Sequence, residues 1–140
     1  MTETPDSAPW PSAWVRAALE PAILGSLAAG PLHGYGIAQA LAEHGFGRLR
    51  GGSLYPVLGR LEEAGHVTAR WVEGASGPGR KDYALTDAGR RAHRDAVAEL
   101  HHLADALGAL ASPAEHADPA GPTVTASTET SADSTEGTSR

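Results

Sequence analysis

The spacing of the apolar residues changes from a helical to an alternating repeat at Gly65, and this change is the strongest constraint on the fold. Before Gly65, apolar residues recur every three or four positions, which is the repeat of one buried helix face. After it, Val67–Trp71 alternate in character and include β-branched side chains, which is typical of a strand. The sequence therefore predicts helices followed by a small β-structure.

The first helical stretch, residues 12–29, is interrupted by a proline. In a helix interior Pro21 would cost about 3 kcal/mol, because it lacks the N–H that bonds to the preceding turn. Two interpretations are open. One helix ends near Leu19 and a second starts at Pro21, where proline suits the first turn, or a single helix is kinked there.

Two further helices are predicted, over Gly34–His44 and over Gly52–Ala64. Each is followed or closed by a glycine, Gly45 and Gly65, which is a common helix stop. The segment Phe46–Gly51 joins them through a short glycine-containing connection. This is the arrangement of a helix-turn-helix.

A hairpin and a last helix complete the pattern. The strand Val67–Trp71 is followed by a flexible loop over Glu73–Gly79 and a second strand over Lys81–Leu85, with basic residues at the expected hairpin tip. A helix is expected from residue 86 to 110. The predicted fold class is mainly α with a small β-hairpin, a winged helix-turn-helix plus a C-terminal helix.

The expected domain organisation follows from where apolar residues are found. Residues 12–85 form the winged helix-turn-helix with its N-terminal helix, and residues 86–110 form a C-terminal dimerisation helix. Residues 1–11 and the acidic segment 111–140 hold too few apolar side chains to offset chain entropy, so both are expected to be disordered.

The net charge of −6 conceals a basic middle. Residues 46–94 contain nine Lys or Arg and five Asp or Glu, whereas residues 111–140 contain one base and five acids. A local basic face is what contact with the DNA backbone requires. The acidic whole-chain balance is therefore compatible with nucleic-acid binding.

Several classes of protein are disfavoured by what the sequence contains. It has no cysteine, no apolar run near the 18 or so residues of a membrane span, and no signal-peptide pattern, so we expect a cytoplasmic protein without a membrane partner. No nucleophile–base set, phosphate loop or metal spacing supports an enzyme or a cofactor. His101 and Asp105, one helical turn apart, are interpreted as solvated or interface side chains and not as metal ligands.

Four blocks of sequence resemble the PadR-type transcription regulators and together span about seventy of the 140 residues, from Leu19 to Gly89. The pieces most specific to that family are His33-Gly34-Tyr35 and Ser53-Leu54-Tyr55-Pro56. The blocks start at Leu19, Gly30, Gly52 and Gly79 and read LEPAILGSL, GPLHGYGI, GSLYPVLGRLEEAG and GRKDYALTDAG.

The resemblance implies a homodimer with a winged helix-turn-helix head, and the single short C-terminal helix is similar to the smaller subclass of the family. It also implies repression of a nearby promoter, often relieved by a small effector. Four positions depart from the family pattern: Pro21, Arg50, Asp82 and Ala84. The last two make the wing less cationic.

The third predicted helix should enter the major groove with its first turns near base edges. For several residues a structural role is also open: Leu54 fits the core better, Tyr55 could pack on the second helix, Arg60 could pair with Glu63, and the wing bases could be solvated. His33 is expected to cap the second helix. The DNA-contact candidates are Tyr35, Arg48, Arg50, Ser53, Leu54, Tyr55, Arg60, Arg80 and Lys81.

The last helix carries apolar residues at spacings of four, three, four and three, which is a coiled-coil seam. An intramolecular core is the alternative to a dimer. Two recognition helices related by a dimer axis would lie about 34 Å apart and read a pseudo-palindromic operator. The dimerisation candidates are Trp14, Ala96, Leu100, Leu103, Leu107 and Leu110.

The site of any effector is unknown from the sequence. Trp10, Trp14 and Trp71 are weak candidates for an aromatic pocket, and core packing is the simpler interpretation for Trp14 and Trp71. The function predicted overall is a dimeric, sequence-specific DNA-binding repressor relieved by a small effector. The alternative is a winged-helix protein-interaction module without specific DNA binding.

Overall fold

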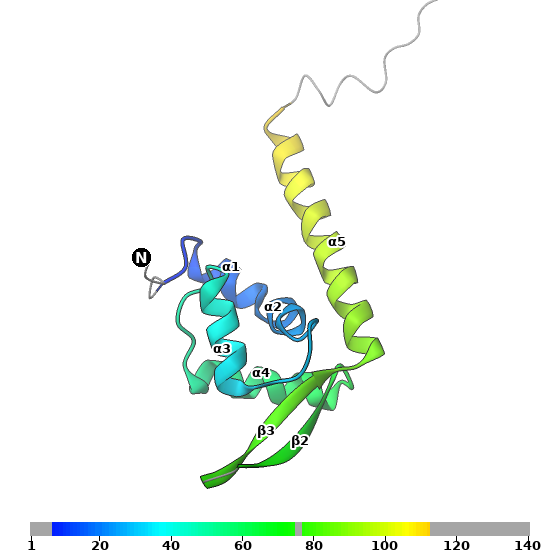
Figure 1. Ribbon diagram of the computed structural model, residues 1–140. Coiled ribbons are helices and arrows are strands. Elements are labelled where there is room, and N and C mark those ends of the chain that lie inside the picture. The colour runs from blue at the N-terminus through cyan, green and yellow to red at the C-terminus, as the bar shows by residue number, and fades with distance from the viewer. Residues whose placement is uncertain (1–6, 75–76, 113–140) are drawn as a thin grey trace, which may run out of the picture. The chain divides into compact units, whose positions relative to one another are not determined.

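The computed structural model describes residues 7–74 and 77–112, and most of the two segments expected to be disordered lies outside this part. The chain divides inside its last helix into two compact units, one ending at Ala98 and one starting at Glu99. The elements are α1 (Ser12–Ala17), α2 (Leu19–Ser26), β1 (Leu32–His33), α3 (Gly34–Glu43), α4 (Gly51–Glu63), β2 (Val67–Gly74), β3 (Gly77–Leu85) and α5 (Asp87–Leu110) (Figure 1).

The break between α1 and α2 decides between the two interpretations of Pro21. The first helix ends at Ala17, and Pro21 is the third residue of α2, inside its first turn. A first-turn residue has no intrahelical acceptor for its N–H, so proline loses nothing there. The interpretation as two helices is confirmed, although α2 stops at Ser26, three residues before the predicted end.

The central helices α3 and α4 match their predicted bounds to within one residue. The connection between them turns at two glycines, Gly45 with φ of +92° and Gly47 with φ of +81°, a conformation that side chains disfavour. Pro56 is the sixth residue of α4 and lies in the second turn of the helix.

The wing is longer than predicted: Glu73, Gly74 and residues 77–79 lie in strands, so the prediction of a loop was wrong there, and residues 75 and 76 lie outside the described part. The β2–β3 ladder continues through Trp71↔Lys81 and Val72↔Arg80 to Gly74↔Gly77, with one irregularity before the end. A Cβ on Gly79 would lie 2.8 Å from the Val72 carbonyl oxygen. These glycines therefore permit close strand approach, where the composition suggested flexibility.

A third strand, β1, was not predicted. It pairs with β3 at Leu32↔Tyr83 and His33↔Asp82, giving an antiparallel sheet of order β1-β3-β2. Two residues are too few to produce an alternating pattern. Because β1 runs directly into α3, the base of the wing is attached to the start of the helix-turn-helix.

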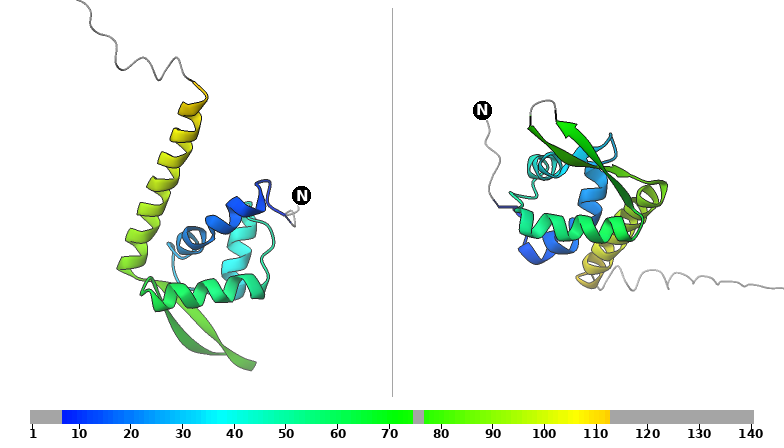
Figure 2. Two further views of the ribbon diagram at one scale, coloured as in Figure 1. Left: turned by 180° about the vertical axis from the view of Figure 1, so that it is seen from behind. Right: turned by 90° about the horizontal axis from the view of Figure 1, so that it is seen from below.

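The core of the first unit lies where α2, α3 and α4 pack together, and β2 and β3 extend away from it as a wing (Figures 1 and 2). Within the described residues no buried side chain is charged. The core residues are Leu19, Ile23, Leu24, Leu27, Ile37, Leu41, Leu54, Val57, Leu58, Leu61, Val67 and Tyr83.

The start of α5 is tied to the end of α4 by the side chain of Thr86. Its hydroxyl donates to the Gly65 carbonyl at 2.7 Å and accepts from the Gly89 N–H at 3.0 Å. This is the helix start predicted for the Thr-Asp-Ala-Gly segment. None of the helices in the described ranges is long and apolar enough to span a membrane.

Candidate nucleic-acid interface

The α4 helix presents two faces, one exposed and one buried. Ser53 and Tyr55, in its first turns, are exposed, whereas Leu54 between them is only 2% exposed and packs in the core. The inclusion of Leu54 among the DNA-contact candidates was therefore wrong. Its side chain belongs to the same buried set as Val57 and Leu58, which anchor the helix.

Tyr55 crosses from α4 to the beginning of α3. Its phenol lies against the α-carbon of Gly34, so closely that a Cβ added there would overlap the hydroxyl and lie 2.7 Å from Cζ. The ring is nevertheless 52% exposed. Tyr55 therefore both packs on α3 and remains accessible to a ligand.

Tyr35 projects from the first turn of α3 and is 70% exposed. Its ring centroid is 6.2 Å from that of His33, which occupies the N-cap position. The His33 side chain makes no capping hydrogen bond, so only the position of the expected cap is confirmed. Arg50 is likewise the N-cap residue of α4 without a side-chain cap, and Arg50 and Arg48 are exposed.

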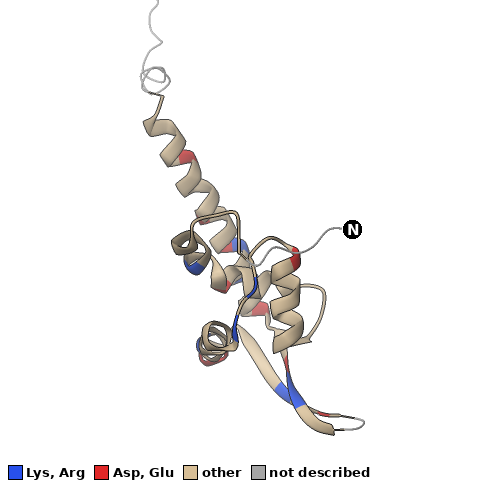
Figure 3. Ribbon diagram, turned by 90° about the vertical axis from the view of Figure 1, so that its left-hand side faces the viewer, with Lys and Arg blue, Asp and Glu red and all other residues tan. Residues whose placement is uncertain are grey.

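The two wing bases lie partway along the hairpin instead of at its tip, because the ladder continues beyond them to Gly74 and Gly77. Figure 3 shows Lys or Arg positions in blue partway along the wing strands. The Arg80 Nε donates to the Asp82 Oδ1 at 3.1 Å. Part of the wing's positive charge is therefore neutralised by its own neighbour, whereas Lys81 lies beside Trp71 across the ladder.

Arg60 does not join this surface. Its Nε lies 3.3 Å from the Glu20 Oε2 on α2, so the ion-pair partner is Glu20 and not Glu63, which the sequence had left open. The guanidinium thus links α4 to α2. Both side chains are about half exposed, so the pair contributes little to stability.

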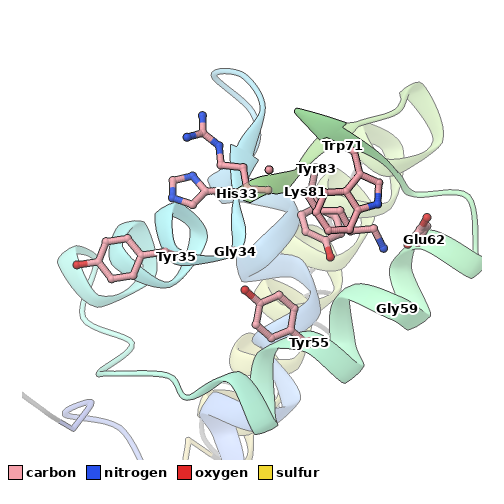
Figure 4. A pocket seen from close by; sticks show the side chains of 11 residues that line it. His33, Gly34, Tyr35, Tyr55, Gly59, Glu62, Trp71, Lys81 and Tyr83 are labelled. Carbon is pink, nitrogen blue, oxygen red and sulfur yellow. The ribbon is translucent and has the colours of Figure 1, made fainter. Parts of the chain in front are cut away.

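A groove of about 490 Å³ lies between the wing, the first turn of α3 and the middle of α4 (Figure 4). Burial raises the pKa of the Tyr83 phenol above its ordinary value, and the nearby Glu62 carboxylate and Tyr55 phenol raise it further. The groove is lined by His33, Gly34, Tyr35, Tyr55, Gly59, Glu62, Trp71, Gly79, Arg80, Lys81 and Tyr83.

Two of the three tryptophans are more exposed than the sequence predicted. Trp71 is 70% exposed and Trp14 65% exposed, so the prediction of core packing was wrong for both. Trp10 packs on Phe46 with ring centroids 5.4 Å apart, at the turn that leads into α4. Only Trp71 lines the groove, so the structure does not gather the three residues into one aromatic pocket.

Along α5 the apolar residues of the predicted seam share one helix face by their spacing. Ala96 is half-buried, and Leu100, Leu103, Leu107 and Leu110 are exposed. Among residues 7–74 and 77–112, no three His, Asp or Glu side chains gather as a metal site.

Sequence reasoning missed two features of the surface. One is Gly34 as the partner of Tyr55, 21 positions away, since the sequence left open only that Tyr55 packs on the second helix. The other is Trp71 with Gly59 and Glu62, which line one groove from different elements. The glycine inside α4 was an available signal, since glycine is disfavoured in helix interiors.

Comparison with known proteins places this arrangement in a family. Residues 23–95, more than half of the chain, match the transcriptional regulator PadR-like family. The transcriptional regulator Rv3488 of Mycobacterium tuberculosis is 38% identical over 91 residues, covering 64% of this chain and 81% of that protein.

Solved structures agree in fold. A PadR family transcriptional regulator from Eggerthella lenta is 35% identical with a TM-score of 0.66, over 72% of this chain and 88% of that one. Bacillus subtilis PadR in complex with operator DNA is 33% identical with a TM-score of 0.53, over 57% of this chain and 45% of that one. The winged helix, the ordered motifs and these matches agree: the chain belongs to the PadR-like family of transcriptional regulators.

Proposed function

We propose that this regulator is a homodimeric, sequence-specific DNA-binding repressor whose α4 enters the major groove. The observation that carries the proposal is the shared exposure of Ser53 and Tyr55 on the first turns of α4, with Tyr35 on α3. In a helix-turn-helix these turns meet base edges, while the preceding helix meets the backbone. That the Bacillus subtilis relative was solved with operator DNA supports the same role here.

The residues divide by chemistry. Ser53 is proposed to read a base edge, since its hydroxyl both donates and accepts. Tyr35, Tyr55 and Lys81 are proposed to contact phosphates, which fix register without reading sequence. Arg48 and Arg50, just before α4, add positive charge at the helix entry. Arg80 contributes less, because Asp82 shares its charge.

Dimerisation is proposed through the apolar face of α5, from Ala96 to Leu110, with Trp14 as a further contact. Exposed leucines at coiled-coil spacing support it, since an unpaired stripe of this kind is a common partner surface. Two recognition helices about 34 Å apart would then read a pseudo-palindromic site. Action in the cytoplasm, without catalysis, and relief of repression by a small effector complete the proposal.

The test is a salt-titrated binding assay with the DNA directly upstream of the coding sequence. We expect binding that exceeds binding to random DNA and weakens as salt rises. Ser53→Ala should change the preferred sequence, and Lys81→Ala should weaken binding to all sequences. Arg60→Ala is the matched control, since its guanidinium faces Glu20.

Equal affinity for upstream and random DNA at every salt concentration would reject regulation of its own gene. Absence of any DNA binding at low salt would reject the DNA-binding proposal altogether. In that case the protein-interaction module becomes the better account of the same surface.

A further inference from the structure

The indole of Trp71 is left largely in water. It lies on the side of the wing that faces α4, paired across the ladder with Lys81, and is mostly exposed. An exposed indole is a large apolar surface in contact with solvent. A ligand that covers it would remove this apolar surface from water.

The part of α4 that lines the same groove contributes a glycine. Gly59 lies inside the helix, where glycine is about 1 kcal/mol less favourable than alanine. A Cβ added there would meet no atom within 4 Å, so packing within this unit does not require the glycine. A missing side chain at such a place permits close approach of a ligand to the helix.

Charges of both signs line the groove. Lys81 and Arg80 line it from the wing, and the Tyr55 hydroxyl lies between α4 and α3. Glu62 is the one acid among the lining residues and lies at the same end of the groove as Trp71, away from Tyr35 (Figure 4). An occupant must therefore present both negative charge, for the cations, and apolar surface, for the indole.

A DNA strand has this combination, because charged phosphates alternate with apolar deoxyriboses along it. A strand separates the major groove, where α4 is proposed to lie, from the neighbouring minor groove. We infer that the groove between α4 and the wing holds one sugar–phosphate strand, with Trp71 packed on a deoxyribose and Lys81 paired with a phosphate. The inference rests on the proposed function and adds Trp71, Gly59 and Glu62 to its binding surface.

Glu62 has a defined effect in this arrangement. Its carboxylate repels a phosphate drawn toward the indole and so lowers affinity for every sequence alike. Glu62→Gln is expected to tighten binding several-fold, with a matched control in Glu63→Gln, which makes the same charge change at an exposed residue outside the groove.

The central experiment uses Trp71 as the only tryptophan, in the full chain carrying Trp10→Phe and Trp14→Phe. The probe is a random-sequence duplex of about 30 base pairs, roughly three turns, at low salt. A contact with the backbone is independent of sequence, so this probe suffices. We expect the Trp71 emission to shift to the blue and to become protected from acrylamide when the duplex is saturating.

Two variants measure the contribution to affinity. Trp71→Ala is expected to weaken binding to the random duplex about ten-fold, and Thr68→Ala, an exposed residue of the same strand that does not line the groove, is the control. Gly59→Leu fills the groove while favouring the helix. It should raise thermal stability and lower DNA affinity together, a combination that misfolding does not produce.

The outcomes separate this inference from the proposed function. Unchanged Trp71 emission in a saturated complex, with Trp71→Ala binding normally, overturns the inference and leaves the DNA-binding proposal standing. Protection of Trp71 by random DNA without any preference for the upstream sequence supports the strand contact and rejects regulation of its own gene. Failure of the unmodified chain to bind either duplex overturns both.

Discussion

The Tyr55 phenol lies directly on the bare α-carbon of Gly34, and this contact places the hydroxyl of α4 against the start of α3. The two residues come from different helices, α4 and α3. Any side chain at position 34 would occupy the place of the ring. The family motif His33-Gly34-Tyr35 therefore has a packing reason for its glycine, in addition to any contact with DNA.

Replacing Gly34 with alanine is expected to push the Tyr55 ring away and to weaken DNA binding several-fold. Tyr55 is half exposed and free to rotate outward, so the fold should survive with a small loss of stability. Titration with DNA and thermal denaturation measure the two effects. Gly36→Ala is the matched control in the same helix, because its Cβ would meet neighbours only at 3.4 Å or beyond. Equal affinities for the two variants would contradict the proposed role of the contact.

Removing the charge of Asp82 is expected to strengthen DNA binding. With Asp82→Asn, Arg80 loses its 3.1 Å ion-pair partner and offers its full charge to the backbone. Affinity should rise for all sequences, and the slope of log affinity against log salt should steepen by about one unit. Asp95→Asn, an exposed acid on α5, controls for net charge. An unchanged slope would show that Arg80 lies away from phosphate.

Gly89→Ala is expected to destabilise the protein by about 1–3 kcal/mol, the usual cost of overpacking. Its Cβ would overlap the His66 carbonyl oxygen and lie 2.8 Å from the Leu85 side chain. Urea denaturation gives the free energy of unfolding. Gly108→Ala in the same helix meets no atom within 4 Å and should stabilise by up to about 1 kcal/mol. Effects of the same sign in both variants would refute this assignment.

Stability is expected to fall in alkali because of Tyr83. Its pKa is raised in the folded state, first by burial and then by Glu62 and Tyr55, above the ordinary 10.0. The folded chain thus holds this proton more tightly than the unfolded chain. The contribution of Tyr83 to stability is complete at pH values below the ordinary pKa of tyrosine. It is lost as pH rises through the higher pKa that Tyr83 has in the folded state. Urea titrations at about pH 8 and about pH 11 should show a smaller loss for Tyr83→Phe than for the unmodified chain, and parallel losses would contradict this.

Leu103→Glu is expected to shift the protein from dimer to monomer and to weaken operator binding strongly. A charge would then lie in the middle of the apolar face of α5, where burial without a partner is costly. Light scattering gives the oligomeric state. Ala98→Glu, an exposed position off the apolar seam, is the control and should remain dimeric. A dimeric Leu103→Glu protein would move the proposed interface elsewhere.

The sequence predicted α3 and α4 well because apolar residues recur along one buried face of each helix and a glycine follows the end of each. It failed for the wing because Gly74 and Gly79 resemble a loop in composition, while their actual role is to let two backbones approach. The two-residue strand β1 carries no period at all. These misses come from contacts between distant segments, which local propensity does not record.

The candidate surface was predicted residue by residue with mixed results. Exposure of Ser53 and Tyr55 follows from the same helical repeat that buries Leu54, so this distinction was available from the sequence. The pairing of Arg60 with Glu20 was not, because those residues are 40 positions apart. Trp71 was assigned to packing on its residue type alone, and the extension of the strands beyond the core leaves it exposed.

The two faces of α4 have a consequence for redesign. Leu54, Val57, Leu58 and Leu61 hold the helix, and none of the exposed positions between them contributes to that core. If the proposed function holds, operator preference and folding are encoded on separate sets of residues within thirteen positions. A library of substitutions at Ser53 is then expected to retarget this regulator to new promoters while its melting temperature stays nearly constant.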